Sequence, residues 1–221
     1  TQDVDIQNIM EEEMANSRYV LPGKDSSGND VTAEAAAVVI DPETGYVVGA
    51  VGQLGEKTTA RGLNRINSPR QTGSSIKPLS DVLPGIEEGI ITPATVYLDT
   101  KTTFGGTWTP KNYNRYTGKR TVRSALTTSQ NIPFIKIQAE LTPAKGIEYL
   151  KKMGVSTLDD EKDNNLASVA IGGFTYGISP LEMAAAYATI ANDGVYIKPT
   201  FYTKAVDSNG NTVLEPSQPT E

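Results

Sequence analysis

Residues 35–51 read AAAVVIDPETGYVVGAV and carry the clearest β-strand pattern in the chain. Two apolar runs flank the segment DPETG, in which Pro42 and Gly45 are turn formers, so the stretch predicts a β-hairpin. Both runs are almost continuously apolar, which predicts burial on both faces of the pair. Two strands buried in this way need further strands beside them. We expect those strands to lie beyond Glu221.

Helical patterns occupy most of the remaining chain. After a loop over residues 52–73, a helix is expected to begin at Ser74, with Pro78 near its start, and to bend or end at Pro84. Apolar spacing and capping signals predict further helices at residues 6–14, at 121–128, from Asn131, from Pro143 to about Met153, and from Pro180 to about Asn192, the last opened by a Ser179–Glu182 capping box.

The segments between these elements are expected to be irregular or extended. They are a polar loop at 23–30, an excursion at 91–119, an exposed acidic loop at 159–163, an extended stretch at 195–206 and a polar C-terminal tail with an Asn-Gly turn. Adjacent acidic residues do not by themselves converge on a cation, so the acidic loop predicts no metal site.

The composition restricts the chemistry. The 221 residues include no Cys and no His, and the formal net charge is −6. The absence of Cys excludes disulfide scaffolds and thiol nucleophiles, and the absence of His excludes Ser-His-Asp triads and imidazole metal ligands. An acidic chain is not typical of nucleic-acid binding. An enzyme with this sequence must take its general base from Lys, Asp, Glu or Tyr.

The tetrapeptide Ser74-Ser75-Ile76-Lys77 is the only Ser-x-x-Lys in the chain. Residues three apart share a helix face, so Lys77 can present its amine to the Ser74 hydroxyl. The helix N-terminus favours a developing oxyanion, and together with burial it lowers the pKa of Lys77. About one such tetrapeptide is expected by chance in a chain with this many Ser and Lys residues. Spacing alone therefore leaves a structural role open.

A second candidate is Ser129-Gln130-Asn131. At a helix junction, the hydroxyl can relay a proton and the amide can hold a substrate carbonyl. Ser and Asn are also common helix caps, and Ser27-Gly28-Asn29 matches the same pattern in an expected turn. Trp108 and Tyr113 lie between the two motifs, where an aromatic ring lines a substrate cleft or packs within the protein.

Taken together, residues 73–78 (GSSIKP) and 125–133 (ALTTSQNIP) resemble the transpeptidase domain of the penicillin-binding proteins. The hairpin, Asn64-Arg65, and the segments 179–184 (SPLEMA) and 191–194 (ANDG) are similar to further parts of that domain. The resemblance covers about Thr1 to Val206. It is strongest to the high-molecular-mass, bifunctional class A type, in which a membrane-anchored glycosyltransferase precedes this domain.

The resemblance implies an α+β fold of the serine β-lactamase and penicillin-binding-protein type, with a mainly helical subdomain and an antiparallel sheet represented here by its first hairpin. It also implies a D,D-transpeptidase that acts on peptidoglycan stem peptides ending in D-Ala-D-Ala and is acylated by β-lactams. No metal or other cofactor is implied.

The resemblance assigns roles to matching residues. Ser74 would be the nucleophile, with its own backbone N–H forming half of the oxyanion hole, and Lys77 would be the acylation base. Ser129 would pass a proton to the departing amine. Asn131 would bind the acyl side-chain amide of the substrate. We take Trp108 as a further substrate-binding residue.

The family's third motif, Lys-Thr/Ser-Gly, is absent. Thr117-Gly118-Lys119 has its letters in the wrong order and is expected to be a surface turn. We therefore expect residues 1–221 to be the N-terminal and central part of the domain, which needs a C-terminal remainder in the same chain or in a separate one.

The whole protein is expected at the extracellular face of the bacterial cytoplasmic membrane, held by an anchor outside this soluble segment. Three alternatives stay open: a serine β-lactamase, a sensor that remains acylated, and a fragment that serves only as a scaffold.

Overall fold

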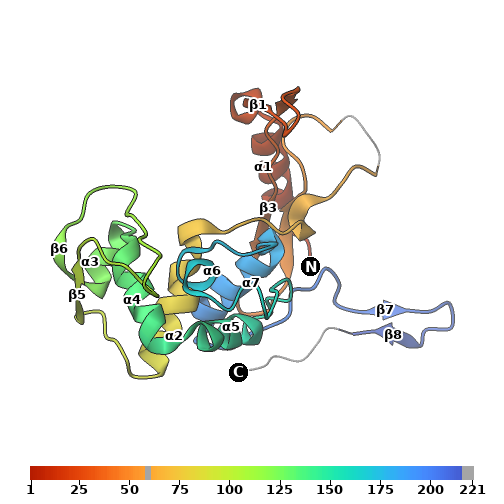
Figure 1. Cartoon of the computed structure of the whole chain (residues 1–221). Coiled ribbons are helices and arrows are strands. Elements are labelled where there is room, and N and C mark those ends of the chain that lie inside the picture. The colour runs from red at the N-terminus through yellow and green to blue at the C-terminus, as the bar shows by residue number, and fades with distance from the viewer. Residues whose placement is uncertain (58–60, 216–221) are drawn as a thin grey trace. The chain divides into compact units, whose positions relative to one another are not determined.

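The computed structural model describes residues 1–57 and 61–215, and the chain forms two compact units (Figure 1). Unit 1 consists of Thr1–Pro69 and Ser179–Glu221, and unit 2 consists of Arg70–Ile178. All five predicted site residues belong to unit 2. Residues 58–60 of the expected loop and residues 216–221 of the expected tail lie outside the described residues.

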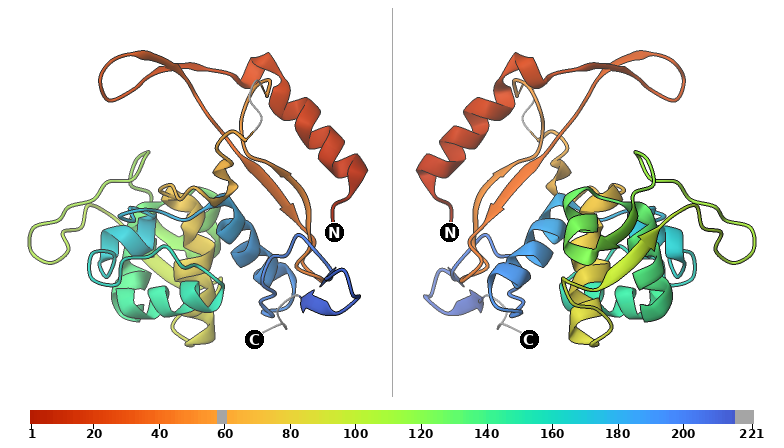
Figure 2. Two further views of the ribbon diagram at one scale, coloured as in Figure 1. Left: turned by 90° about the vertical axis from the view of Figure 1, so that its right-hand side faces the viewer. Right: turned by 90° about the vertical axis from the view of Figure 1, so that its left-hand side faces the viewer.

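Unit 1 contains the predicted hairpin. Strands β3 (Ala37–Ile40) and β4 (Val47–Val51) pair antiparallel, as expected. Helix α1 (Val4–Ala15) packs on β4, and helix α7 (Pro180–Ala191) packs on β3; Figure 2 shows α1 alongside the hairpin. The expected burial on both faces is wrong, because the two helices cover only part of the pair and Val39 stays 38% exposed.

Helix α7 begins as predicted. The Ser179 hydroxyl accepts a hydrogen bond from the Glu182 N–H, and the Glu182 carboxylate accepts one from the Ser179 N–H. This reciprocal pair satisfies two N–H groups that a helix N-terminus otherwise leaves without partners.

Two exposed hairpins of unit 1 are closed by the same device. Strands β1 (Pro22–Lys24) and β2 (Asp30–Thr32) replace the expected loop, and β7 (Ala205–Val206) and β8 (Thr212–Leu214) lie where extended chain and a polar tail are predicted. Asp25 accepts two backbone N–H bonds across the first turn, and Asp207 does so across the second. Such Asx turns fold a polar segment back without an apolar core. Short 3₁₀ turns at Ser17–Tyr19 (η1) and Arg65–Asn67 (η2) complete the unit.

Unit 2 is mainly helical. The segment expected to begin at Ser74 forms a 3₁₀ turn at Gly73–Ile76 (η3), a π-helix at Pro78–Val82 (η4) and an α-helix at Leu83–Glu87 (α2). Pro84 has no N–H to donate, and the helix changes type just before it instead of ending there. The single helix expected from Ser74 is therefore three successive helical types, and the segment does not end at Pro84 but continues to Glu87.

The remaining helices of unit 2 surround a common core. Helices α3 (Val122–Thr127), α4 (Asn131–Leu141) and α5 (Pro143–Lys152) confirm the predictions, although the Thr142 side chain does not cap α5. The pattern missed helix α6 (Leu166–Ile171). One core cluster consists of Ile91, Val122, Ala125, Phe134, Ile137 and Leu141.

Two expected loops of unit 2 are more ordered than predicted. Strands β5 (Val96–Asp99) and β6 (Gly118–Thr121) pair within the expected excursion, so Thr117-Gly118-Lys119 leads into a strand and is not a free surface turn. In the acidic loop, Asp163 is fully buried, which corrects the expectation that the whole run is exposed.

Candidate active site

The centre of the candidate site is the amine of Lys77, whose side chain is fully buried. Its Nζ lies 3.0 Å from the Ser129 carbonyl oxygen, 3.3 Å from Ser129 Oγ, 3.1 Å from the Gln130 carbonyl oxygen and 2.8 Å from Asn131 Oδ1. The structure thus brings together three of the predicted site residues, from two segments about 50 positions apart in the sequence. We call this group the Lys77 cluster.

The backbone at Ser129 explains how the cluster forms. Ser129 has a φ of 52°, a left-handed conformation that is uncommon for residues other than Gly. The Ser129 and Gln130 N–H groups bond back to the carbonyls of Leu126 and Ala125, which closes the end of α3. The tight reversal leaves the Ser129 and Gln130 carbonyls free to accept bonds from Lys77. Non-Gly residues in this conformation concentrate at functional sites.

Asn131 is held by Asn112, a residue that the sequence analysis did not single out. The Asn112 side-chain oxygen accepts the Asn131 N–H at 2.8 Å, and its Nδ2 donates to Asp99 at 2.7 Å. The Asn131 Nδ2 donates to the Lys111 carbonyl at 2.8 Å, which turns its Oδ1 toward Lys77. No local pattern predicts this link, because Asp99, Asn112 and Asn131 are far apart in the sequence.

Ser74 lies in η3 and is exposed. Within the described residues its hydroxyl makes no hydrogen bond, so the expected contact with Lys77 is not formed in this structure. Ser74 is held close to the cluster through the backbone, because it is three residues before Lys77 and the Lys77 N–H donates to the Ser74 carbonyl.

Two glycines fix the backbone before Ser74. A Cβ on Gly172 would lie 2.2 Å from the Gly73 carbonyl oxygen, and one on Gly177 would lie 2.0 Å from that of Arg70. Both glycines have positive φ, which other residues adopt at a cost. The segment from Gly172 to Ile178 therefore packs directly against residues 70–73, where Arg70 and Ile178 exchange backbone hydrogen bonds.

The electrostatics of the cluster favour a neutral amine. Burial lowers the pKa of Lys77 to about 8, against the opposing effect of the negative charge on Asp81. The Phe134 ring centroid lies 5.3 Å from Nζ and adds an apolar wall. An amine with such a pKa is partly unprotonated near neutral pH and can accept a proton from a hydroxyl.

Trp108 lies apart from these contacts. Its ring packs on Phe104 at a centroid distance of 5.9 Å, and it borders a hollow with Asn165, Leu166 and Ala167 near α6. No hydrogen bond or ring contact among the described residues joins it to the Lys77 cluster. Its role in substrate binding stays a prediction, and Tyr113 is almost fully exposed.

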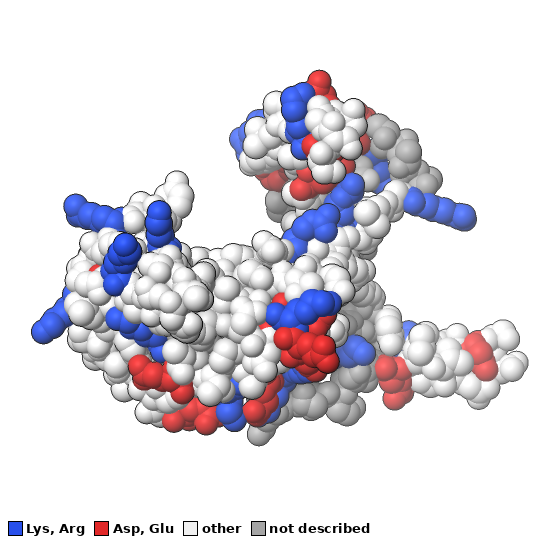
Figure 3. Space-filling model, in the orientation of Figure 1, with Lys and Arg blue, Asp and Glu red and all other residues white. Residues whose placement is uncertain are grey.

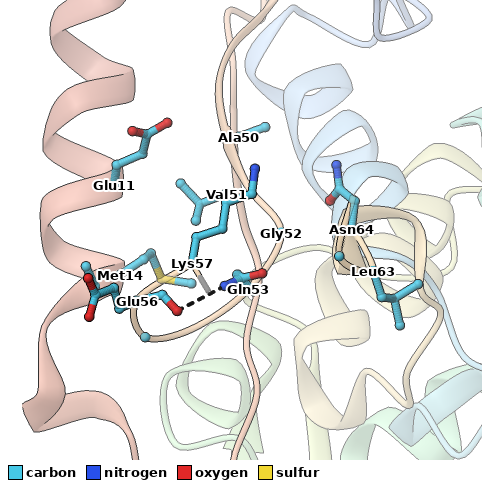
Figure 4. A pocket seen from close by; sticks show the side chains of 13 residues that line it. Glu11, Met14, Ala50, Val51, Gly52, Gln53, Glu56, Lys57, Leu63 and Asn64 are labelled. Carbon is cyan, nitrogen blue, oxygen red and sulfur yellow. Dashed lines mark hydrogen bonds between the residues drawn. The ribbon is translucent and has the colours of Figure 1, made fainter. Parts of the chain in front are cut away.

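Unit 1 contains a second hollow that is separate from the predicted chemistry. Residues of α1, the end of β4 and the following loop line it, including Met14, Gln53, Glu56 and Asn64, and Figure 4 shows the hydrogen bond from Gln53 to the Glu56 carbonyl. None of the predicted catalytic or substrate-binding residues borders it. Across residues 1–57 and 61–215, no group of three acidic residues is arranged to hold a metal ion.

The surface around β5, β6 and α3 is basic. Residues 96–136 include seven Lys or Arg residues but one acidic residue, the buried Asp99. Figure 3 shows Lys and Arg side chains gathered over these elements. Within the described part of the chain, none of the seven forms an ion pair. The basic surface comprises Lys101, Lys111, Arg115, Lys119, Arg120, Arg123 and Lys136.

Among the described residues, no helix combines the length and the apolar character that crossing a bilayer requires.

Known proteins resemble this chain over most of its length. A family profile described as the penicillin binding protein transpeptidase domain matches residues 35–220. Penicillin-binding protein 1F of Bacillus subtilis is 38% identical over 189 residues, covering 85% of this chain and 25% of the relative. Penicillin-binding protein 1A of Clostridium botulinum is 34% identical over 218 residues, covering 93% of this chain and 26% of the relative. The chain thus spans about a quarter of the length of these curated relatives.

Solved structures agree on the fold. The PonA1 protein of Mycobacterium tuberculosis, in a complex with penicillin V, superimposes with a TM-score of 0.76 at 27% identity, covering 97% of this chain and 56% of that chain. Penicillin-binding protein 1A of Haemophilus influenzae superimposes with a TM-score of 0.68 at 27% identity, covering 90% of this chain and 30% of that chain. The predicted α+β fold type is confirmed.

Proposed function

The chain belongs to the penicillin-binding-protein transpeptidase family, and on that premise we propose that it contributes the acylation site of a serine D-Ala-D-Ala transpeptidase in peptidoglycan cross-linking. The observation that carries the proposal is the Lys77 cluster. A buried lysine with a lowered pKa lies three residues after Ser74 and contacts both Ser129 and Asn131. That set provides a nucleophile, a base, a proton relay and an amide without His or Cys.

The proposed reaction begins with a proton transfer. The neutral Lys77 amine takes the Ser74 hydroxyl proton while Ser74 Oγ attacks the carbonyl carbon of the penultimate D-Ala, which gives a tetrahedral oxyanion and an ammonium on Lys77. Collapse of this species expels the terminal D-Ala amine, which receives the proton through Ser129 and leaves an acyl-Ser74 ester. An acceptor amine from a neighbouring stem peptide then attacks the ester and regenerates the Ser74 hydroxyl.

The other groups bind and orient the substrate. Asn131 is held by Asn112 and by the Lys111 carbonyl, and we propose that its amide exchanges one of these contacts for the substrate's acyl side-chain amide. The Ser74 N–H would stabilise the oxyanion. We place Trp108 at the edge of the substrate path. Stem peptides and β-lactams carry carboxylates, which the basic surface would attract.

The proposal includes a second component. The Lys-Thr/Ser-Gly motif of the family does not occur in this sequence, so residues 1–221 would act as part of the domain, with that motif supplied by a further segment. The relatives are penicillin-binding proteins of about four times this length. We propose that the whole protein is anchored in the cytoplasmic membrane, with this part on the extracellular side, where peptidoglycan is cross-linked.

A covalent-labelling experiment tests the function. The whole protein that contains this chain is incubated with a fluorescent penicillin, and the labelled band is measured for the natural sequence and for Ser74→Ala. We expect Ser74→Ala to abolish labelling, while Ser75→Ala, its exposed neighbour, keeps it. Labelling that survives in Ser74→Ala contradicts the assignment.

Turnover assays separate the alternatives. Fast hydrolysis of a chromogenic cephalosporin would identify a β-lactamase instead. Stable acylation without exchange of D-Ala in a stem peptide would identify a sensor.

A further inference from the structure

Unit 2 contains three fully buried aspartates, Asp81, Asp99 and Asp163. Asp99 accepts hydrogen bonds from Asn112 Nδ2, the Thr117 N–H and Thr117 Oγ1 at 2.7–2.8 Å. Asp163 accepts them from the Asp159 N–H, the Thr175 N–H and Thr175 Oγ1 at 2.7–3.0 Å. Neither carboxyl oxygen of Asp81 has a hydrogen-bond partner among the described residues. Because burying an unpartnered carboxyl is costly, Asp81 calls for an explanation.

Against the larger effect of burial, the Ser80 hydroxyl lowers the pKa of Asp81, but it donates its hydrogen bonds elsewhere. Ser80 is next to Asp81 in the chain, and its hydroxyl bonds to the carbonyls of Val169 at 2.8 Å and Ile76 at 3.2 Å. Asp81 is also the only charged residue between Pro78 and Ile86. A carboxyl in an otherwise uncharged, buried turn adds nothing to packing, since an apolar side chain would fill that space without the cost of desolvation.

The charged group that acts on Asp81 is the amine of Lys77, at the candidate site. Asp81 follows Lys77 by four residues in one continuous helical segment, and both side chains are fully buried. The four oxygens around Lys77 Nζ belong to carbonyls, a hydroxyl and an amide, so none carries a charge. The charge of a protonated Lys77 is therefore balanced by no anion in its hydrogen-bonding shell.

In the part of the chain that the structure describes, no other charged group near this turn is buried and able to balance the charge of Lys77. Helices α2, α4, α5 and α6 and turn η3 pack against η4. Helix α6 and η3 have no charged residue, and those on the other three are partly or fully exposed to solvent. They are Glu87 of α2, Lys136 and Glu140 of α4, and Lys145, Glu148, Lys151 and Lys152 of α5. Water screens such groups, which leaves Asp81 and Lys77 as the buried pair of opposite charge.

The effects of the two groups on each other agree with this geometry. Burial raises the pKa of Asp81 well above its ordinary value, and the charge of Lys77 opposes that rise. The charge of Asp81 likewise raises the pKa of Lys77 against the larger effect of burial. Buried groups that interact in this way titrate as a coupled pair.

We propose that Asp81 is a positioning residue that stabilises the ammonium form of Lys77 as it develops during acylation of Ser74. The inference rests on the proposed function. When Lys77 takes the Ser74 proton, a positive charge forms in a site that water does not reach. Asp81 offers a buried carboxyl whose negative charge is favoured once Lys77 is an ammonium, and it makes none of the hydrogen bonds to Lys77 that Ser129 and Asn131 make. The arrangement parallels the buried carboxylate behind the base of a Ser-His-Asp triad, with lysine in place of histidine.

The test is the pH dependence of acylation. In the whole protein, the rate of fluorescent-penicillin labelling, per labelled site at completion, is measured from pH 6 to pH 10. For the natural sequence the rate rises with pH through about 8, because only the neutral amine accepts the proton. Asp81→Asn and Asp81→Ala both remove the charge, so both should move the midpoint to lower pH by about one unit or more. Both should also lower the plateau rate, because the remaining amine is a weaker base.

A matched control separates charge from packing. Asp163→Asn changes an equally buried aspartate of the same unit, whose bonds go to Asp159 and Thr175, and should reduce stability without moving the midpoint. The inference is overturned if the pH midpoint of acylation does not move in the Asp81 variants that fold. It is also overturned if Asp163→Asn moves that midpoint by the same amount. Loss of labelling in Ser74→Ala with no shift in the Asp81 variants keeps the proposed function and rejects this inference alone. Labelling that persists in Ser74→Ala rejects the function first.

Discussion

The Lys77 cluster and the bonds around Asp163 are two regions of unit 2 built on a fully buried charged side chain, and they treat the charge in opposite ways. Asp163 receives three hydrogen bonds at 2.7–3.0 Å, from both sides of α6. Lys77 donates to uncharged oxygens, and burial lowers its pKa to about 8. The donors around Asp163 satisfy its carboxyl and hold two loops together. Lys77, in contrast, has a lowered pKa, which is typical of a residue that exchanges a proton in a reaction.

The largest expected effect on the rate of acylation comes from substitution of Lys77. Lys77→Ala removes the base, so acylation by a fluorescent penicillin should slow by roughly 100- to 10,000-fold. Thermal unfolding should show that the protein still folds, because the substitution removes a buried amine whose charge opposes burial. Lys152→Ala is the control, since that exposed lysine of α5 pairs with Glu148 and belongs neither to the cluster nor to the basic surface. Labelling at the natural rate in Lys77→Ala would show that another group is the base.

For Asp163 we expect the opposite result, which is a loss of stability without a change in the pH dependence of acylation. Asp163→Ala leaves three hydrogen-bond donors without their acceptor, one on the half-buried Asp159 and two on the exposed Thr175, so the free energy of unfolding should fall by about 2 kcal/mol. Urea unfolding measures the loss, and the folded fraction should keep the pH midpoint of acylation. Asp160→Ala, three residues earlier, breaks an exposed ion pair with Lys151 and should cost less than about 0.5 kcal/mol. Similar losses in the two variants would remove the distinction between the regions.

Local patterns predicted much of both units because the signals lie within a few residues. The Ser179–Glu182 capping box, the start of α4 at Asn131 and the β3–β4 hairpin all formed as the sequence indicates. The Ser-x-x-Lys and Ser-x-Asn motifs also marked the residues that meet at the Lys77 cluster. Neither motif alone was specific, and their meeting in space is what the structure adds.

The parts that sequence reasoning missed depend on contacts between distant segments. Asn112 joins Asp99 to the start of α4, and burial of Asp163 follows from Thr175, which is 12 residues away. Pairing of β5 with β6 joins the two ends of a segment whose Thr, Gly and Asn residues suggested irregular chain. Asp81 did leave a signal, because it is a single charge in an apolar helical turn, but that signal has meaning only with Lys77 known to be buried.

A smaller effect is expected from the backbone that supports Ser74. Gly172→Ala places a methyl group 2.2 Å from the Gly73 carbonyl oxygen at a φ of 77°. The left-handed conformation alone costs about 1–2 kcal/mol, and relief of the clash must shift η3. We expect roughly 10-fold slower acylation, with the pH midpoint near 8 unchanged because Lys77 and Asp81 keep their surroundings. Gly89→Ala has a similar φ but no atom within 4 Å, so it should affect stability alone. A moved midpoint in Gly172→Ala would show that the Lys77 cluster depends on η3.

The smallest expected effect concerns cations that remain in water. Arg115 and Arg123 belong to the basic surface, are exposed, and have no ion-pair partner within the described residues. Reversing both, as Arg115→Glu with Arg123→Glu, should slow labelling by an anionic penicillin about 2- to 3-fold at low ionic strength, through weaker attraction alone. The difference should disappear near 0.5 M salt, where the screening length is shorter than about 5 Å. Arg18→Glu, an exposed arginine of unit 1 already paired with Glu13, is the matched reversal and should leave the rate unchanged. Because screening barely reaches a buried charge, the pH midpoint set by Lys77 should stay fixed as salt is added. A midpoint that moves with salt would place Lys77 in contact with solvent and remove its contrast with these surface arginines.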